Sequence, residues 1–210
     1  MNKNLSTVVV DYGAGNLRSV EKVLRYINAD FTVTSDPKQV ELSDVVILPG
    51  VGAFPEAMRR LNGIGMTDAL KKHVSISKKP LLGICLGMQM LFEKSYEFGE
   101  TEGLGFLKGE VKKMELEGLK IPHMGWNSLT FTKVSPFEQD LKNSPFCYFV
   151  HSYKAETPEA NIIAYTEYGS KVPALVGNGI AFGAQFHPEK SGDVGLKMLR
   201  NFYDWINKEL

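Results

Sequence analysis

The chain has 210 residues, of which 43% are hydrophobic and 23% charged, the size and composition of one soluble globular domain. Its 24 basic residues balance its 24 acidic residues, so it has no net charge that would attract nucleic acid or an acidic membrane. No apolar run reaches the roughly 20 residues of a membrane span, and we expect neither nucleic acid nor a membrane as a partner.

The first part of the chain alternates between predicted strands and helices. A β-branched run at 7–10 leads into a Gly-containing loop, and apolar residues from Leu17 to Ile27 then recur at helical spacing. Strands are also predicted at 31–34 and 44–48, and the second of these runs into a glycine-rich loop at 49–52. Helices are predicted near 54–62 and 67–77.

A fourth apolar strand is predicted at 80–84, and the residues at 87–93 have a helix-forming composition. Strand candidates follow near 110–114, 128–132, 146–150, 161–166, 173–176 and 180–185, some of them antiparallel. A closing helix has an apolar stripe that includes Val194, Met198 and Phe202. This alternation predicts one α/β domain, 1–210, with a mostly parallel central sheet flanked by helices. Ligands of such sheets bind at the carboxyl ends of the strands.

The segment GICLG at 83–87 places Cys85 between two glycines where a strand passes into a helix. This pattern is typical of a nucleophile elbow with cysteine in place of serine. The helix dipole favours the thiolate form, and the amide N–H of Leu86 faces the reaction centre. A lone cysteine is usually a buried packing residue, but the two glycines favour the catalytic interpretation.

Two further features are expected beside this cysteine. Gln89 lies one helical turn after Cys85, so its amide is expected to face a polar substrate at the sulfur. The loop that contains Gly50, Val51 and Gly52 is expected to turn backbone N–H groups towards an oxyanion during acyl transfer. The alternatives are that Gln89 is a solvated helix residue and that the glycine-rich loop is an ordinary turn.

A cysteine nucleophile requires a base and a group that orients this base. His187 and Glu189, on either side of Pro188, supply both. Pro188 favours an extended backbone at His187, and residues 187 and 189 of an extended segment point to the same side. We therefore expect a hydrogen-bonded pair. By itself, the same motif would be a loop histidine beside a helix-capping glutamate.

The remaining histidines, His73, His123 and His151, are widely separated and have no metal-ligand spacing, so we expect no metal site. We also expect no cofactor. Cys147 lies in an apolar strand pattern and is interpreted as a core residue, and two cysteines are too few for a disulfide framework. Because the N-terminal residues lack the apolar stretch of a secretion signal, we expect a cytoplasmic protein.

The segment GICLGMQ around Cys85, with the distant FHPE that contains His187 and Glu189, resembles the class I glutamine amidotransferases. The fold of that family is flavodoxin-like, and its triads consist of Cys, His and Glu. Within this class the chain is similar to the glutaminase subunits of imidazole glycerol phosphate synthases, from histidine biosynthesis. The other matching segments span almost the whole chain: DYGAGNLRSV at 11–20, LPGVGAF at 48–54, PHMGWN at 122–127, YFVHSY at 148–153 and GAQFHPEKSG at 183–192.

The resemblance implies that Cys85 attacks the side-chain amide of L-glutamine, that His187 transfers protons and that Glu189 orients His187. A γ-glutamyl thioester forms before water releases glutamate, and ammonia is the useful product. The resemblance also implies an oxyanion hole, with one N–H from Leu86 and one from the loop of Gly50 and Val51. The residues that hold glutamine are then Gly52, Gln89, Ser152 and Tyr153.

A partner is implied as well, a (β/α)8-barrel cyclase subunit that receives ammonia through an internal channel and makes imidazole glycerol phosphate and AICAR. Four residues match interface positions of the family: Asn16, Trp126, Tyr148 and Lys190. Ammonia released in the absence of the partner is lost to solvent. We therefore expect low glutaminase activity from the isolated chain.

Three other interpretations remain open at this point. One is the glutaminase subunit of another class I amidotransferase, such as pyridoxal phosphate synthase, against which GICLGMQ and PHMGWN argue. Another is a free-standing thiol hydrolase on a related fold, which strong partner-independent turnover would favour. The last is a catalytically silent binding module, which would be favoured if Cys85 failed to react with a glutamine-analogue alkylator.

Overall fold

The structure is a computed structural model that describes residues 5–115 and 117–209. Its first elements are β1 (Thr7–Val10), α1 (Leu17–Tyr26), β2 (Phe31–Thr34), α2 (Pro37–Leu42), β3 (Val45–Gly50), α3 (Phe54–Gly63), α4 (Met66–Lys71), the π-helix η1 (Lys72–Ile76), β4 (Leu81–Cys85), α5 (Leu86–Gln89), β5 (Phe92–Ser95) and β6 (Thr101–Glu102). The later ones are β7 (Leu107–Lys113), β8 (His123–Ser128), β9 (Thr130–Phe131), β10 (Phe146–His151), β11 (Tyr153–Glu156), the 3-10 helix η2 (Glu159–Asn161), β12 (Ile162–Glu167), β13 (Lys171–Gly177), β14 (Ala181–Ala184), the 3-10 helix η3 (Pro188–Lys190) and α6 (Gly192–Glu209).

The described residues form a central sheet with the strand order β2-β1-β3-β4-β14-β13-β12-β9. Neighbouring strands from β2 to β14 run parallel, and those from β14 to β9 run antiparallel. The predicted α/β fold, with a mostly parallel sheet and additional antiparallel strands, is therefore confirmed. The order 2-1-3-4, extended by a fifth parallel strand, is that of flavodoxin-like folds.

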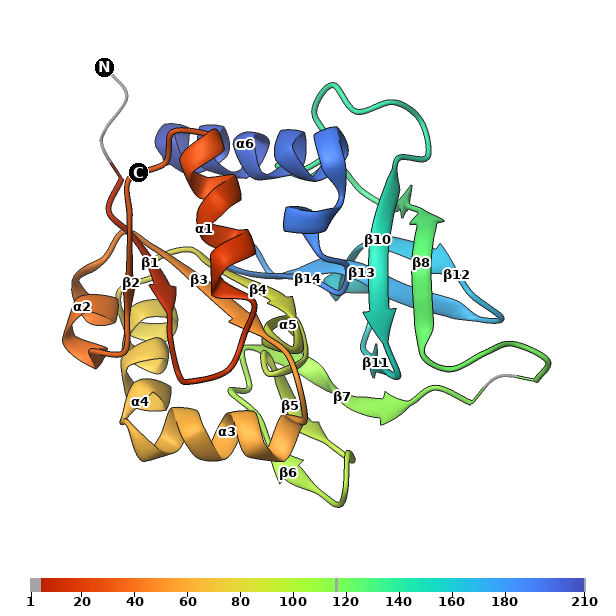
Figure 1. Cartoon of the computed structure of the whole chain (residues 1–210), viewed down its shortest axis with the longest axis horizontal. Coiled ribbons are helices and arrows are strands. Elements are labelled where there is room, and N and C mark those ends of the chain that lie inside the picture. Colours follow the sequence, from red (N-terminus) through yellow and green to blue (C-terminus); the bar gives the residue numbers. More distant parts are fainter. Residues whose placement is uncertain (1–4, 116, 210) are drawn as a thin grey trace.

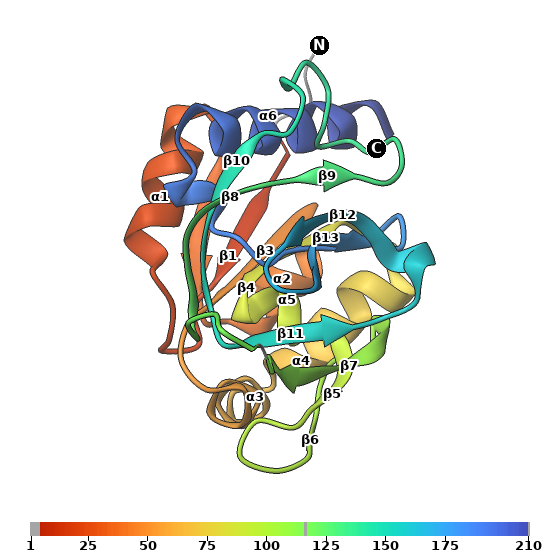
Figure 2. The same ribbon diagram turned by 90° about the vertical axis from the view of Figure 1, so that its right-hand side faces the viewer.

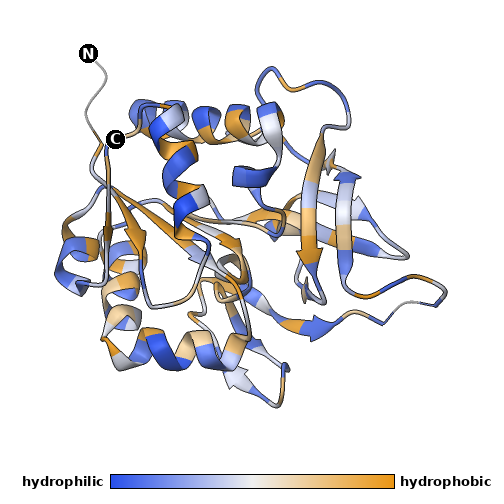
Figure 3. Cartoon of the chain, in the orientation of Figure 1, coloured by the Kyte–Doolittle hydropathy of each residue, from blue (hydrophilic) through white to orange (hydrophobic). Residues whose placement is uncertain are grey.

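Helices cover both faces of the sheet, as Figures 1 and 2 show, with α1 and α6 on one side and α3 and α4 on the other. In β1, Val9 packs in the cluster of α1 and α6, while Val8 and Val10 pack with α3 and α4. This alternation follows from the two-residue period of a strand. It explains the continuous hydrophobic colour of the central strands in Figure 3, since both of their faces are buried.

The predicted strands at 7–10 and 31–34 are confirmed as β1 and β2. The predicted helix at 87–93 is wrong beyond Gln89, where α5 ends. The carbonyl of Met90 accepts the N–H of Leu104, and that of Leu91 accepts the N–H of Phe106, both at 2.8 Å. Because a distant segment takes these carbonyls, the helix stops and residues 92–95 form β5.

Two other stretches differ from the sequence prediction. The predicted strand at 128–132 is split between the end of β8 and the short β9, which belong to different sheets. No helix is predicted at 37–42, yet α2 forms there. Its start has the local signals of a helix, with Pro37 in the first turn and the Asp36 carboxylate accepting the N–H of Lys38 at 2.9 Å.

None of the helices in residues 5–115 and 117–209 combines the length and the hydrophobicity needed to cross a lipid bilayer.

At one side of the central sheet, β8 and β10 form an antiparallel ribbon, visible side by side in Figure 1, in which His123 is paired with His151. The chain turns from β10 directly into β11, which joins a second sheet with β7, β5 and β6. This turn lies beside the carboxyl ends of the parallel strands.

Candidate functional site

The corner at Cys85 has the geometry of a nucleophile elbow. Cys85 ends β4 and immediately precedes α5, with φ of 54° and ψ of −109°. A residue other than glycine adopts such a backbone conformation at a cost of roughly 1–3 kcal/mol, and the surrounding packing must stabilise it. The strand passes into the helix within one residue, and the Cys85 side chain lines a cavity.

Close packing around this corner requires the glycines on either side. A Cβ on Gly83 would lie 2.5 Å from the carbonyl oxygen of Gly87, and a Cβ on Gly87 would overlap the carbonyl oxygen of Leu48. In the neighbouring strand, a Cβ on Gly50 would lie 2.7 Å from the hydroxyl of Tyr12. The helix α5 therefore rests directly on the backbone of β3 and β4.

His187 follows β14, the parallel neighbour of β4, so it lies at the same edge of the sheet as Cys85. Its Nδ1 hydrogen donates to Glu189 Oε1 at 2.7 Å, and both side chains are almost completely buried. The expected pair is present, but the backbone conformation that brings the two side chains together differs from the predicted extended segment. His187 is extended, whereas Glu189 lies in the 3-10 turn η3, which brings residues two apart onto one side.

Hydrogen bonds to β10 hold this turn in place. The backbone N–H of His187 donates to the carbonyl of Tyr148 at 2.9 Å. The hydroxyl of Ser191 donates to the carbonyl of His187 at 2.7 Å and accepts the N–H of Tyr148 at 3.0 Å. The imidazole is thus positioned through its own backbone as well as through Glu189.

The charge of His187 depends on its two acidic neighbours. Burial lowers the pKa of His187, but Cys85 and Glu189 outweigh burial and raise it to about 9. Within the described part of the chain, the buried Nε2 of His187 has no hydrogen-bond partner. Because Glu189 occupies Nδ1, Nε2 is the atom through which this ring can exchange a proton in the cavity.

The cavity at these strand ends has a volume of about 350 Å³, within the range of small-molecule sites. It brings together sequence candidates for the nucleophile, base, oxyanion and substrate roles, and it adds Glu97, Val150 and His151. Glu189 and Gly50 do not line it; they lie behind His187 and Leu86. The full lining is Val51, Gly52, Cys85, Leu86, Gln89, Glu97, Val150, His151, Ser152, Tyr153, His187 and Lys190.

Two glutamines lie beside Cys85: Gln89, which lines the cavity, and Gln185, which is fully buried. Gln89 donates through Nε2 to the carbonyl of Tyr153 at 3.1 Å and to Gln185 Oε1 at 3.0 Å. Gln185 in turn donates to Cys85 Sγ at 3.8 Å. Gln185 was not among the residues predicted from the sequence, although it lies only two residues before His187. The available signal in the sequence was a glutamine between an apolar strand pattern and the segment of His187 and Glu189, and the structure shows this glutamine fully buried.

The candidate oxyanion groups lie beside the sulfur. Leu86 is the first residue of α5, so its N–H has no partner from a preceding helical turn. Gly50 is paired with Cys85 across β3 and β4, while Val51 is 42% exposed at the mouth. Glu97, also missed from the sequence, accepts the N–H of Phe54 at 2.7 Å and so ties the loop after Gly52 to the cavity wall.

Three of the four candidate interface residues form one patch. The rings of Trp126 and Tyr148 meet edge to face at 6.1 Å, and Lys190 Nζ lies 5.9 Å from the Tyr148 ring. Trp126 is 56% exposed, which is unusual for so large an apolar side chain. Asn16 is half-buried at the N-terminal cap of α1.

The structure brings two of the other histidines together. His123 and His151 are far apart in sequence, but His123 Nδ1 lies 3.0 Å from His151 Nε2. Even so, residues 5–115 and 117–209 contain no group of three or more potential ligands arranged for a metal ion. Cys147 is completely buried in β10, and burial raises its pKa to about 12, which leaves an unreactive thiol.

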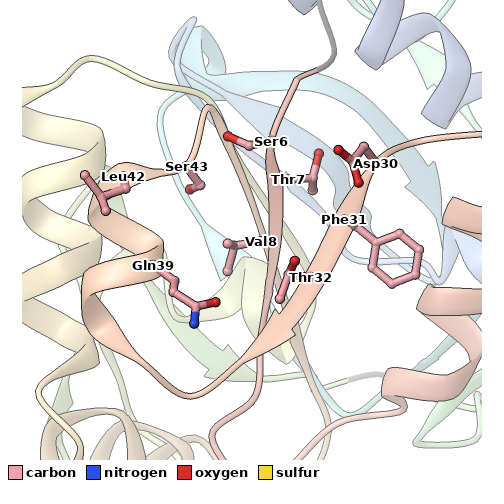
Figure 4. A pocket seen from close by; sticks show the side chains of 9 residues that line it. All are labelled: Ser6, Thr7, Val8, Asp30, Phe31, Thr32, Gln39, Leu42 and Ser43. Carbon is pink, nitrogen blue, oxygen red and sulfur yellow. The ribbon is translucent and has the colours of Figure 1, made fainter.

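Another cavity, of about 230 Å³, lies at the opposite, amino-terminal ends of β1 and β2. Figure 4 shows the residues that line it, which include Val8 of β1 and Thr32 of its neighbour β2, while the ring of Phe31 points away from them. Its lining contains neither a cysteine nor a histidine. The cavity at the carboxyl ends is therefore the candidate active site, in agreement with the general location of sites in parallel sheets.

The family model for "Glutamine amidotransferase class-I" matches residues 8–205 of the chain. The fold, the elbow cysteine and the histidine–glutamate pair agree with that match, and the chain belongs to the class I glutamine amidotransferases. It is 52% identical over 199 residues to "Imidazole glycerol phosphate synthase subunit HisH" of Caldanaerobacter subterraneus subsp. tengcongensis, covering 94% of this chain and 97% of that protein. The protein of the same name from Bacillus cereus is 51% identical over 194 residues, 92% of each chain.

Solved structures share the fold at lower sequence identity. One titled "Crystal structure of glutamine amidotransferase" is 20% identical with a TM-score of 0.74, over 96% of this chain and 98% of the other. A glutamine amidotransferase from Thermotoga maritima is 18% identical, with a TM-score of 0.64 over 98% of this chain and 85% of the other. These two likenesses bear on the fold alone.

Proposed function

We propose that this chain is the glutaminase subunit of an imidazole glycerol phosphate synthase in histidine biosynthesis. The observation that carries the chemistry is Cys85, on its strained corner, sharing one cavity with His187, which is bonded to Glu189. The choice of synthase is supported by 52% and 51% identity to relatives named as its HisH subunit, over more than nine tenths of each chain.

In the first half of the reaction, the thiolate of Cys85 attacks the side-chain carbonyl carbon of glutamine. The carbonyl oxygen becomes negatively charged, and the N–H groups of Leu86 and of the Gly50–Val51 loop stabilise it. His187 gives its Nε2 proton to the amide nitrogen as the carbon–nitrogen bond breaks. Ammonia leaves, and a γ-glutamyl thioester remains on the sulfur.

In the second half, His187 acts as the base. Its Nε2 takes a proton from water as the water oxygen attacks the thioester carbonyl. The carbon–sulfur bond breaks, glutamate is released, and the thiolate and the protonated imidazole are restored. Glu189 keeps Nε2 directed into the cavity throughout, because it holds the hydrogen of Nδ1.

The cavity wall supplies the groups that hold glutamine. Gly52, Gln89, Ser152 and Tyr153 all line the cavity, and Gln89 is joined to the carbonyl of Tyr153 by a hydrogen bond. Glu97 adds a carboxylate to this lining, which suits the ammonium group of an amino acid. We assign the α-amino end of the substrate to the side of Glu97 and the amide to Cys85.

The partner in this proposal is the (β/α)8-barrel cyclase subunit, which consumes the ammonia and makes imidazole glycerol phosphate and AICAR. The patch of Trp126, Tyr148 and Lys190, with Asn16, is assigned to the contact with it. Lys190 also lines the cavity, so the two surfaces are adjacent. A free thiol nucleophile requires reducing conditions, and both cysteines are free; we therefore propose a cytoplasmic reaction.

The test measures glutamate release from L-glutamine by three mixtures: the chain alone, the chain with the cyclase, and the chain with the cyclase and its nucleotide substrate. Large stimulation only in the third mixture is the expected result. Strong release by the chain alone would instead favour a free-standing hydrolase. Absence of release in all three would exclude this pairing and favour another amidotransferase partner or a silent module.

A further inference from the structure

His123 and His151 form a buried pair beside the candidate active site. They are directly opposed in the ribbon of β8 and β10, with exposed fractions of 2% and 6%. The His123 ring is stacked between Phe149, at 4.7 Å, and Tyr168, at 4.0 Å. Such a pair in a hydrophobic ribbon requires that every ring nitrogen has a suitable partner.

The partners fix the direction of the hydrogen bonds. The carbonyl of Tyr153 accepts from His151 Nδ1 at 2.8 Å, so that nitrogen carries the hydrogen and His151 Nε2 is an acceptor. His123 Nδ1 therefore carries a hydrogen and donates to His151 Nε2. The remaining nitrogen, His123 Nε2, accepts from Asn127 Nδ2 at 3.4 Å.

The orientation of Asn127 supports this direction. Its Oδ1 accepts the N–H of Ser128 at 2.8 Å, and its Nδ2 also donates to the carbonyl of Glu167 at 3.0 Å. The amide therefore presents its nitrogen to the ring. From Asn127 through His123 and His151 to Tyr153, each group donates to the next, and this is consistent only with two neutral rings.

The chain of hydrogen bonds ends at the candidate substrate site. The carbonyl of Tyr153 accepts both from His151 and from Gln89 Nε2. The second hydrogen of Gln89 Nε2 goes to Gln185. Both hydrogens of this amide are thus committed, and Oε1 is the group that Gln89 offers to N–H donors of a ligand in the cavity.

We propose that His123 and His151 are positioning residues for the glutamine site: as a neutral, one-directional pair they hold the Tyr153 carbonyl, and through it Gln89, in the binding geometry. The proposal rests on the proposed glutaminase function. Neither ring transfers a proton to the reacting atoms in this role. The pair instead determines how tightly the cavity wall holds L-glutamine.

An added proton on either ring would break one of these hydrogen bonds, because two N–H groups would then face each other. The titratable groups that face the pair are His187, whose charge lowers the pKa of His151, and Tyr168, stacked on His123. Neither imidazole has a carboxylate partner among the described residues. Burial is the largest cause that lowers both pKa values, to about 4, so both rings are neutral near pH 7.

The first experiment reads the tautomers of the wild-type chain directly. Nitrogen-15 NMR of the histidine rings at pH 7 is expected to show His123 and His151 neutral, each with its hydrogen on Nδ1. A charged ring, or a hydrogen on Nε2 of either residue, would overturn the proposal. This measurement requires neither activity nor a variant that folds.

The second experiment measures KM and kcat for L-glutamine in the chain bound to the cyclase. His123→Phe keeps the stacked ring but removes the donor, and we expect KM to rise roughly tenfold with kcat changed less than about threefold. His151→Asn retains a donor at the place of Nδ1, so its KM should be closer to wild type than that of His151→Leu. The control is His73→Phe, since His73 is equally buried but bonds to Val40 and Pro80; its KM should not change.

The possible failures are distinguishable. If the wild-type complex hydrolyses no glutamine, the proposed function is wrong. If the wild type is active but His123→Phe leaves KM unchanged, the positioning role is overturned and the proposed function stands. The same conclusion follows if His151→Asn and His151→Leu raise KM equally, or if His73→Phe raises it as much as His123→Phe.

Discussion

At the scale of single residues, the candidate site depends on one residue with a strained backbone and on one buried hydrogen bond. Cys85 adopts a positive φ, and the close packing of α5 on the backbone of β3 and β4 stabilises this conformation. His187 shares its Nδ1 hydrogen with Glu189, so the direction of Nε2 is set before a substrate arrives. Each feature leads to a measurable consequence.

Replacing the nucleophile should separate glutamine hydrolysis from ammonia use. In Cys85→Ala no thioester can form, so glutamine-dependent synthesis in the complex with the cyclase should be abolished. Synthesis from added ammonium salt should continue, since the cyclase is intact. Glutamine-dependent turnover that persisted in this variant would exclude the thioester mechanism.

Replacing Glu189 should change the titration of His187. The carboxylate and Cys85 together hold the pKa of His187 at about 9. Glu189→Gln removes one of these two influences, so the pKa should fall, and glutaminase activity should decrease at least about 10²-fold because the imidazole loses its orienting partner. NMR titration of the ring gives the pKa, and an unchanged value would contradict this account.

At the scale of elements, the short helix α5 is stabilised by contact with strand backbone rather than by its own length. Its four residues are too few to be stable alone. The pairing of residues 90–93 with the segment at 103–107 ends it and forms β5 instead. The elbow therefore exists because β3, β4 and the downstream segment fit closely around it.

A methyl group at Gly87 should disrupt that fit. Gly87→Ala would place a Cβ on the carbonyl of Leu48, and forced overpacking of this kind costs about 1–3 kcal/mol. Urea unfolding should show that loss. The matched control is Gly63→Ala near the end of α3, where nothing lies within 4 Å and where the change should be neutral or stabilising by roughly 0.5 kcal/mol. Equal effects of the two changes would contradict the packing argument.

At the scale of the whole molecule, buried imidazoles make stability depend on pH. Burial is the largest cause that lowers the pKa of His73, His123 and His151. The stability contributed by a neutral buried ring is complete above its unfolded pKa of about 6.5 and is lost as the pH falls through the folded pKa. His187 behaves oppositely, because its pKa is raised to about 9; its contribution is complete below pH 6.5 and is lost as the pH rises through about 9.

We therefore expect the urea midpoint to be highest near pH 6.5 and to fall on both sides. For His123 and His151, a pKa of about 4 in place of 6.5 corresponds to roughly 3 kcal/mol per ring lost on acidification. In His123→Phe the acid limb should become shallower, because one of the titrating rings is gone. A midpoint that stays constant between pH 6.5 and 4.5 would contradict the prediction.

The exposed patch around Trp126 should determine association with the cyclase. Trp126→Ala removes a large exposed ring from this patch and should weaken binding by about 2 kcal/mol, as loss of an aromatic anchor of an interface often does. Leu42→Ala is the control, since Leu42 is 79% exposed on α2, far from the patch (Figure 1). Unchanged affinity and unchanged coupled turnover in variants of all four candidate positions, Asn16 included, would refute the assignment.

Local sequence patterns determined a large part of this molecule. The β-branched run at 7–10 and the glycine frame of Cys85 depend on neighbours a few residues away, so strand β1 and the corner were predictable. The histidine–glutamate pair was predictable for the same reason, although a 3-10 turn rather than an extended strand forms it. Asp36 and Pro37 carried an equally local signal for α2, which the prediction of elements missed.

Tertiary structure decided what depends on distant partners. Residues 92–95 form a strand because carbonyls beside them bond to residues 103–107, which overrides a helical composition. His123 meets His151, and Gln185 meets Gln89, across intervals of 28 and 96 residues. No local pattern encodes such contacts, because the hydrogen bonds that define them form only when β8 pairs with β10 and when α5 packs beside the end of β14. Sequence alone therefore predicted the candidate catalytic residues, and the folded chain decided how they are held.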